Sequence, residues 1–295
     1  MPLRRKIFPV LFCSAIFLSS GCLKAAPPAA SIHEAHQKFL KLCREEYHYS
    51  VVTKKLANTF WIYVPMEEEM ITVKSSLKGA QESSGYTDIF SLQFVAANLD
   101  NNTWRIQYDI SPGRKYAKDP GYTNGYSESY QKIQNNILSV VSRAFFDVEK
   151  PPEFFVLVLA DIKGGLESKN IFYFQDFKRA MSLPPSLSQE EYAKRYLSEL
   201  TGDPKVTGDK TGAHLAFKEI TWPEFLARQI EYRVRFKYQQ SSFPPSGESA
   251  QQLLDIAREV FEAYDVKNFE AVEVRDVISG KTKTVSRDDL HLSGK

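Results

Sequence analysis

Two short stretches of this 295-residue chain share an alternating pattern, and the same order of elements follows each of them. Near residue 104 the chain reads WRIQYDI, and near residue 232 it reads YRVRFKY. In both stretches aromatic or β-branched residues alternate with polar ones, which is typical of a half-buried strand with one face in water. A polar loop containing Gly and Pro comes next in both places.

A helix and then a hairpin are predicted after each loop. Apolar residues recur at three- and four-residue spacing, which indicates a helix lying on a sheet. They are Ile133, Ile137, Val140, Val141, Ala144 and Phe145 in the first helix, and Leu253, Ile256, Ala257, Val260, Phe261 and Tyr264 in the second. EFFVLVLADI and KNIFYFQDF flank one Gly-containing turn, and FEAVEVRDVI and KTKTVS flank another. Such turns between apolar runs are hairpin signals, so the order β-α-β-β is predicted twice.

The N-terminal part has the same order without its first strand. A predicted helix places His36, Phe39, Leu40, Cys43 and Tyr47 on one face, and VVTKKLA and TFWIYVP then flank a turn at Ala57 and Asn58. Three α-β-β units predict an α+β fold with helices packed on antiparallel or mixed sheets. The order of elements is similar to that of envelope assembly domains of the POTRA type, as an analogy of element order alone.

The units set the predicted domain boundaries. The first unit covers residues 32–79, the second 80–183 and the third 214–295, with a helix and a mobile linker at 184–213 between them. Ser188 and Glu191 have capping-box spacing ahead of a helix to about Leu200, and the turn-rich TGDPKVTGDKTG follows. The same spacing from Thr221 to Glu224 opens a short helix before the alternating stretch near residue 232.

The first 21 residues have the layout of a secretory signal peptide. Arg4, Arg5 and Lys6 are followed by an apolar run at residues 7–18 and then by small residues. About 12 apolar residues are fewer than the roughly 20 that a membrane-spanning helix needs. A short N-terminal anchor that stays attached is the alternative.

Leu18-Ser19-Ser20-Gly21-Cys22 resembles the lipobox of bacterial lipoproteins, although Ser19 stands where that family usually has a larger aliphatic residue. The resemblance implies that residues 1–21 are removed and that the Cys22 thiol takes a diacylglycerol, so that acyl chains hold the protein on a membrane. Residues 22–31, which include AAPPAA, are then a tether. Because Leu23 rather than Asp follows the cysteine, the resemblance favours the outer membrane in a Gram-negative cell, with the body in the periplasm or at the cell surface. The whole chain loosely resembles uncharacterised bacterial envelope lipoproteins.

Charge and cysteine content agree with export. Removing residues 1–21 takes away three of the 38 Lys and Arg residues and none of the 36 Asp and Glu residues, which leaves a nearly neutral body. A nucleic-acid partner, which needs a clustered basic face, is therefore not expected. With Cys13 removed and Cys22 acylated, Cys43 has no disulfide partner, and its place on an apolar helix face predicts burial.

The sequence contains no recognised catalytic, phosphate-binding or metal-binding motif. We therefore assign no catalytic residue, metal ligand or cofactor site. The most unusual stretch is GRKYAKDPGYTNGYSESY, in which Tyr116, Tyr122, Tyr126 and Tyr130 lie among small polar residues. Tyrosines in this setting are common at recognition surfaces, so these four form a candidate recognition loop. The alternative is that they pack on a sheet edge.

These observations favour a lipid-anchored, non-enzymatic envelope protein that binds another envelope protein or a cell-wall component, or supports an assembly. One alternative is a cell-wall or peptide-processing enzyme without a recognisable motif, which predicts a pocket with converging His, Asp and Glu side chains. Another is a carrier of a small ligand, which predicts an enclosed apolar cavity.

Overall fold

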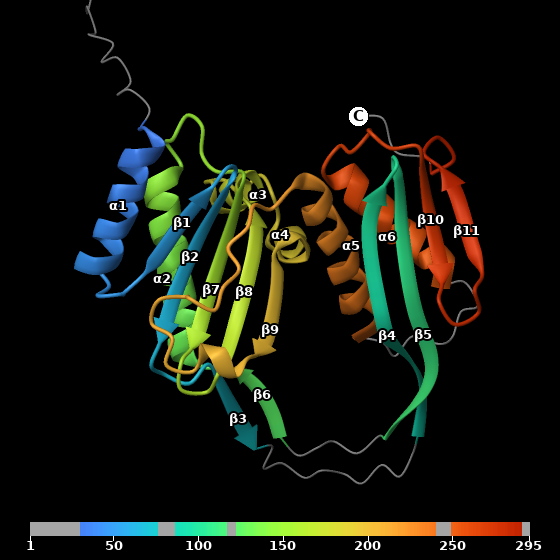
Figure 1. The fold of residues 1–295 in the computed structure, drawn as a ribbon, viewed down its shortest axis with the longest axis horizontal. Helices are drawn as coiled ribbons and strands as arrows, with labels where there is room; N and C mark the ends of the chain where they lie inside the picture. Colours follow the sequence, from blue (N-terminus) through green and yellow to red (C-terminus); the bar gives the residue numbers. More distant parts are fainter. Residues whose placement is uncertain (1–29, 76–85, 117–121, 240–248, 291–295) are drawn as a thin grey trace, which may run out of the picture.

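The computed structural model describes residues 30–75, 86–116, 122–239 and 249–290 (Figure 1). Within these residues, helices pack on a five-stranded and a four-stranded sheet, which confirms the predicted α+β class with mixed sheets. The two sheets belong to two lobes that lie side by side, with one helix, α5, between them (Figure 1).

The first lobe combines the first two predicted α-β-β units. Its elements are α1 (Ile32–Glu45), β1 (Val52–Leu56), β2 (Thr59–Met66), α2 (Glu128–Phe145), β7 (Phe154–Asp161), β8 (Leu166–Tyr173), α3 (Phe174–Met181), α4 (Gln189–Arg195) and β9 (Leu197–Gly202). The strand order is β1-β2-β7-β8-β9, with β2 and β7 parallel and all other neighbours antiparallel. The two units thus form one sheet, joined at β2 and β7, with α1 and α2 on the same face.

The second lobe repeats this arrangement. Its elements are β4 (Tyr86–Asp100), β5 (Thr103–Tyr116), α5 (Trp222–Gln239), α6 (Ser249–Ala263), β10 (Ala271–Asp276) and β11 (Thr282–Ser286). The order is β11-β10-β5-β4, and again two antiparallel hairpins meet at a parallel pair, here β5 and β10. Between the lobes, β3 (Ile71–Ser75) pairs with β6 (Tyr122–Tyr126). In the sequence, β3 comes directly before β4, and β6 comes directly after β5. Helix α6 and strands β10 and β11 follow one another as predicted for the third unit. Strand β5, predicted as the first strand of the second unit at 80–183, lies instead in this sheet, beside β10.

The periodicities predict most of the buried faces correctly. In β5 the alternating residues Trp104, Ile106 and Tyr108 are buried, as a strand with one wet face requires. In α2 the predicted stripe faces the core, and the Ser127 hydroxyl caps the helix by accepting from the Tyr130 N–H at 3.1 Å. The hairpins β1–β2, β7–β8 and β10–β11 form where predicted.

The prediction of a strand at YRVRFKY is wrong, because this stretch lies inside α5. Its cap is Thr221, whose hydroxyl accepts from the Glu224 N–H at 3.4 Å, and no Gly or Pro follows Pro223 to end the helix before residue 239. Four of the buried apolar residues are four apart, which places them on one helical face toward the second lobe. They are Leu226, Ile230, Val234 and Tyr238. Phe236, which belongs to the alternating set, is 45% exposed.

The prediction of a helix and mobile linker at 184–213 also needs correction. Helix α4 ends at Arg195, and Leu197 starts β9 at the edge of the sheet rather than continuing the helix to Leu200. The following segment contains a 3-10 turn at Pro204–Val206 and is fixed to the first lobe, with Val206 fully buried and the Gly208 N–H donating to Ile162 O at 2.9 Å. Residues 203–221 cover the sheet face opposite α1 and α2 (Figure 1).

Three apolar clusters hold the lobes. The first lies between the sheet and α1 and α2, around Phe60, Phe145 and Phe155, and it includes Cys43, whose predicted burial is confirmed. The second fills the second lobe, and the third lies under residues 203–221 and includes Phe225 of α5. Helix α5 therefore packs on both lobes. Within the described part of the chain, no helix is long and apolar enough to cross a membrane.

Candidate functional site

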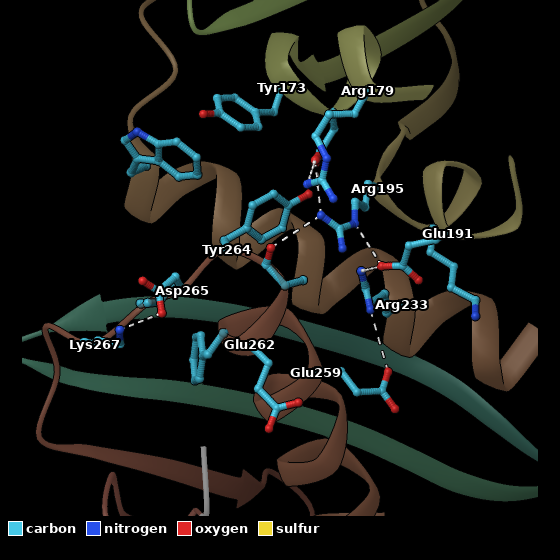
Figure 2. A pocket seen from close by; sticks show the side chains of 16 residues that line it. Tyr173, Arg179, Glu191, Arg195, Arg233, Glu259, Glu262, Tyr264, Asp265 and Lys267 are labelled. Atoms are coloured by element: carbon cyan, nitrogen blue, oxygen red, sulfur yellow. Dashed lines mark hydrogen bonds and ion pairs between the residues drawn. The ribbon is translucent and has the colours of Figure 1, made fainter. Parts of the chain in front are cut away.

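A cavity of about 880 Å³ lies where α3, α4, α5 and the end of α6 meet (Figure 2). Residues from the first lobe line one wall: Tyr173, Asp176, Arg179, Glu191, Lys194 and Arg195. The opposite wall comes from α5, from α6 and from the residues after it: Trp222, Arg233, Glu259, Phe261, Glu262, Ala263, Tyr264, Asp265, Val266 and Lys267. The cavity is therefore an interlobe site.

Arg195 lies at the centre of a buried ion network in this cavity (Figure 2). Its side chain is only 9% exposed; Nη1 donates to Asp176 Oδ1 at 3.1 Å, and Nε donates to Glu191 Oε1 at 2.8 Å. The guanidinium also lies over the Tyr264 ring, 5.3 Å from its centre. Burial raises the pKa of Asp176, and the charge of Arg195 only partly offsets this effect. Because burying charges costs free energy, a buried ion network need not stabilise the fold.

Helix positions fix the network. Ser188 caps α4 by accepting from the Glu191 N–H at 3.1 Å, and Glu191 and Arg195 are then four apart on one helical face. Helix α4 ends at Arg195, and the side-chain amide of Gln229 in α5 donates to Arg195 O at 2.7 Å. That bond joins α5 to the end of α4.

Arg233 is the second buried cation, and some of its N–H groups make no hydrogen bond with the described residues. Its side chain is 9% exposed, with Nη2 lying 3.7 Å from Glu191 Oε1 and Nη1 lying 3.6 Å from Glu259 Oε2. Both distances exceed hydrogen-bond length. Within the described residues, Nε and Nη2 have no hydrogen-bond partner. These two atoms form the side of a guanidinium that binds a carboxylate with two parallel bonds.

The charges around the cavity balance. Five basic side chains face five acidic ones: Arg179, Lys194, Arg195, Arg233 and Lys267 against Asp176, Glu191, Glu259, Glu262 and Asp265. A neutral set of charges gives no general attraction for a polyanion, but it suits a ligand that carries both signs. Tyr173, Trp222 and Tyr264 add aromatic surface, which stacks on apolar or planar groups.

A second cavity, of about 480 Å³, continues from the first along α5. The two share Lys194, Arg233 and Glu259, so Arg233 lies at their junction. Beyond it, Tyr232, Phe236 and Ile256 make the wall more apolar. The site therefore changes from charged and aromatic near Trp222 to apolar near Phe236.

Among the described residues that line the cavity there is no Cys, His, Ser or Thr. In the described part of the chain, no cluster of three or more His, Cys, Asp and Glu residues is suited to hold a metal ion. The geometry can bind and orient a charged ligand.

His214 belongs to a different cluster and is fully occupied. Its Nδ1 lies 2.6 Å from Asp209 Oδ2, its Nε2 lies 2.8 Å from Glu167 Oε2, and its side chain is 6% exposed. Burial alone lowers the pKa of His214, but the hydrogen bonds and charges of the two carboxylates outweigh burial and raise it above its usual value. With neither ring nitrogen free, this histidine holds residues 209–214 onto β8.

The structure does not bring the four tyrosines of the candidate recognition loop into one loop. Tyr116 ends β5 and pairs with Tyr86 of β4, whereas Tyr122 begins β6, and the side chains of both lie outside the described residues. Tyr126 ends β6 and stacks on Tyr130, with ring centres 4.3 Å apart. Tyr130 is buried, and its hydroxyl lies 2.8 Å from Ser168 Oγ. Tyr130 therefore packs in the core of the first lobe, whereas Tyr126 is partly exposed.

Cys22 and most of the predicted tether lie outside the described residues. The first described residue, Ala30, forms a parallel bridge with Val148, which follows α2. This contact fixes the point at which the N-terminal segment joins the first lobe. The lipid attachment itself stays a prediction.

Sequence analysis missed the residues of the interlobe site. The capping box before α4 was the available signal, because it places Glu191 and Arg195 on one face. The strand predicted at YRVRFKY includes Arg233, so the pattern does not predict its place on helix α5. In comparisons with known proteins, no family model, no curated protein and no solved structure matches this chain.

Proposed function

We propose that this chain is a lipid-anchored protein of the bacterial cell envelope that binds, in its interlobe cavity, a ligand carrying both positive and negative groups. The expected ligand is a peptide, either a segment of another envelope protein or the peptide portion of a cell-wall component. The observation that carries the proposal is Arg233, a buried guanidinium at the junction of the cavities whose Nε and Nη2 make no hydrogen bond with the described residues. A ligand carboxylate would satisfy these donors once the Arg233 side chain turns toward it, and nearby Glu259 would receive an amine.

The lipid anchor rests on the sequence from Arg4 to Cys22. If it is correct, mass spectrometry of the membrane-extracted protein will show an N-terminal acylated Cys22 and no residues 1–21. Cys22→Ser is expected to move the protein from the membrane fraction to the soluble fraction, because the acyl chains would be absent. Cys13→Ser is the matched control, since that residue would be removed with the signal peptide. An intact N-terminus in the mature protein would contradict the anchor.

Ligand binding in the cavity can be tested by crosslinking in living cells. A photoreactive residue replaces Lys267, which lines the cavity and is 63% exposed, or Ile278, which is 73% exposed in the β10–β11 turn. We expect a discrete envelope peptide or protein to crosslink from position 267 and not from position 278. Arg233→Met is expected to abolish this product because it removes the guanidinium donors while keeping an unbranched side chain.

Arg228→Met is the matched control for Arg233→Met. Arg228 lies on the same helix, 23% exposed, and pairs with Glu199 and Glu224 rather than lining the cavity. Equal crosslinking by both variants would show that Arg233 does not bind the ligand. If no product forms from position 267 and the purified protein hydrolyses a cell-wall fragment, the enzyme alternative would replace this proposal.

A further inference from the structure

The loop that follows α3 exposes apolar side chains at its tip. Leu183 is 96% exposed and Met181 is 42% exposed, and Pro184 and Pro185 next to them are also exposed. A single exposed aliphatic residue is ordinary on a protein surface. Here, however, Leu183, Pro184 and Pro185 are consecutive exposed apolar residues, and hydrogen bonds close the loop that carries them.

Short contacts close the loop at its base. The Ser186 N–H donates to Arg179 O at 3.0 Å, and the Ser182 hydroxyl donates to the same oxygen at 2.9 Å. Leu187, the next residue, is 5% exposed and belongs to the core of the first lobe. Leu183 therefore lies at the tip of an ordered loop.

The backbone of this loop suits an apolar environment. A backbone N–H without a partner is costly in hydrocarbon, and proline has none. Pro184 and Pro185 therefore remove two donors from the exposed part of the loop. The Pro184 carbonyl accepts from the Ser182 hydroxyl at 3.1 Å.

The loop lies at the end of the first lobe where the N-terminal segment joins it. Ala30 pairs with Val148. Two residues before Val148, Phe146 packs on Phe177 of α3 with ring centres 5.6 Å apart, and its carbonyl accepts from Lys178 Nζ at 2.6 Å. Helix α3 ends at Met181, so the loop and the start of the N-terminal segment are on the same side of the lobe (Figure 1).

We infer that residues 181–185 form a second membrane contact, in which Leu183 and Met181 enter the lipid surface beside the acyl anchor and set the orientation of the protein. This inference rests on the proposed lipid anchor. Cys22 is eight residues from Ala30, and eight extended residues span at most about 29 Å, so the anchored protein must keep this end close to the bilayer. The side chains bury apolar surface in the lipid, and the orientation that allows this is favoured.

The test uses the acylated protein, extracted from membranes and reconstituted in vesicles of phosphatidylethanolamine and phosphatidylglycerol. Leu183→Cys is labelled with a polarity-sensitive nitrobenzoxadiazole dye, and Ile278→Cys, at an exposed apolar position in the second lobe, is the matched control. Cys43 is fully buried, and burial raises the pKa of its thiol to about 12, so it does not compete for the label.

Nitroxide lipids then report contact. We expect them to quench the dye at position 183 several-fold more than the dye at position 278, and we expect a blue shift in emission only at position 183. Equal quenching at both positions, or none at 183 while the protein floats with the vesicles, would overturn the second contact and leave the anchor standing. Failure of the protein to float with vesicles would overturn the anchor, and the second contact with it.

Discussion

Val234→Asp is expected to unfold the second lobe, whereas Phe236→Asp is expected to leave the protein folded. In α5 the Val234 side chain is fully buried among Ile230, Leu253 and their neighbours, whereas Phe236 is 45% exposed. Burying an unpaired carboxylate costs several kcal/mol, which is a large part of the roughly 5–15 kcal/mol that stabilises a domain. At Phe236 the carboxylate reaches water, and the cost is about 1 kcal/mol or less.

Circular dichroism and urea unfolding measure both variants. The pair also separates the two structures that the sequence allows, because residues 234 and 236 share a face in a strand but not in a helix. A strand would make both substitutions severe or both mild. Similar unfolding midpoints for the two variants would therefore contradict α5 as a helix.

The same stretch shows how far the sequence could predict this fold. Alternation in WRIQYDI predicts β5 correctly because Gly and Pro residues nearby leave no room for a helix. In YRVRFKY the apolar positions 234 and 238 satisfy both periods, two and four, so the local pattern cannot choose. The capping box before Trp222 and the absence of a breaker after Pro223 decide for the helix, and these signals lie outside the alternating stretch.

Strand pairing was beyond the reach of local patterns for a different reason. Alternation gives the buried face of a strand, but not its neighbour. Thr59 pairs with Phe154 and Thr103 pairs with Ala271, across very long sequence separations. For the same reason the site could not be predicted: Arg195 and Arg233 meet only because α5 packs against both lobes.

The turn residues of segment 184–213 are common in mobile linkers, which is why the sequence predicts mobility there. In the structure, Val206 and Asp209 fix this segment to the sheet.

At a pH below 6.5, where the ring is protonated, His214→Ala is expected to lower the free energy of unfolding by about 3 kcal/mol, because it removes a cation held between two largely buried carboxylates. Glu167 and Asp209 are 14% and 11% exposed, and after the change each loses its bond to the ring. His214→Gln keeps a polar side chain but no charge, so it should restore only part of the loss. His33→Ala, at an exposed site, is the control. A loss no larger than that of the control would show that the cluster does not stabilise the protein.

The contribution of His214 should also depend on pH in a defined direction. The pKa of the folded ring is raised above 6.5, so the folded state holds the proton more tightly than the unfolded chain. The stabilisation is therefore complete below pH 6.5 and is lost as the pH rises through the folded pKa. Burial alone would raise the pKa of Asp209, but hydrogen bonds from His214 and Thr211 outweigh it and hold that pKa below 3.8, so the share from Asp209 is lost as the pH falls through the acidic range. In urea unfolding across this pH range, the free energy of unfolding should fall much less for His214→Ala than for the unchanged protein as the pH rises above 6.5. An equal fall in that variant would show that other groups cause the alkaline loss of stability.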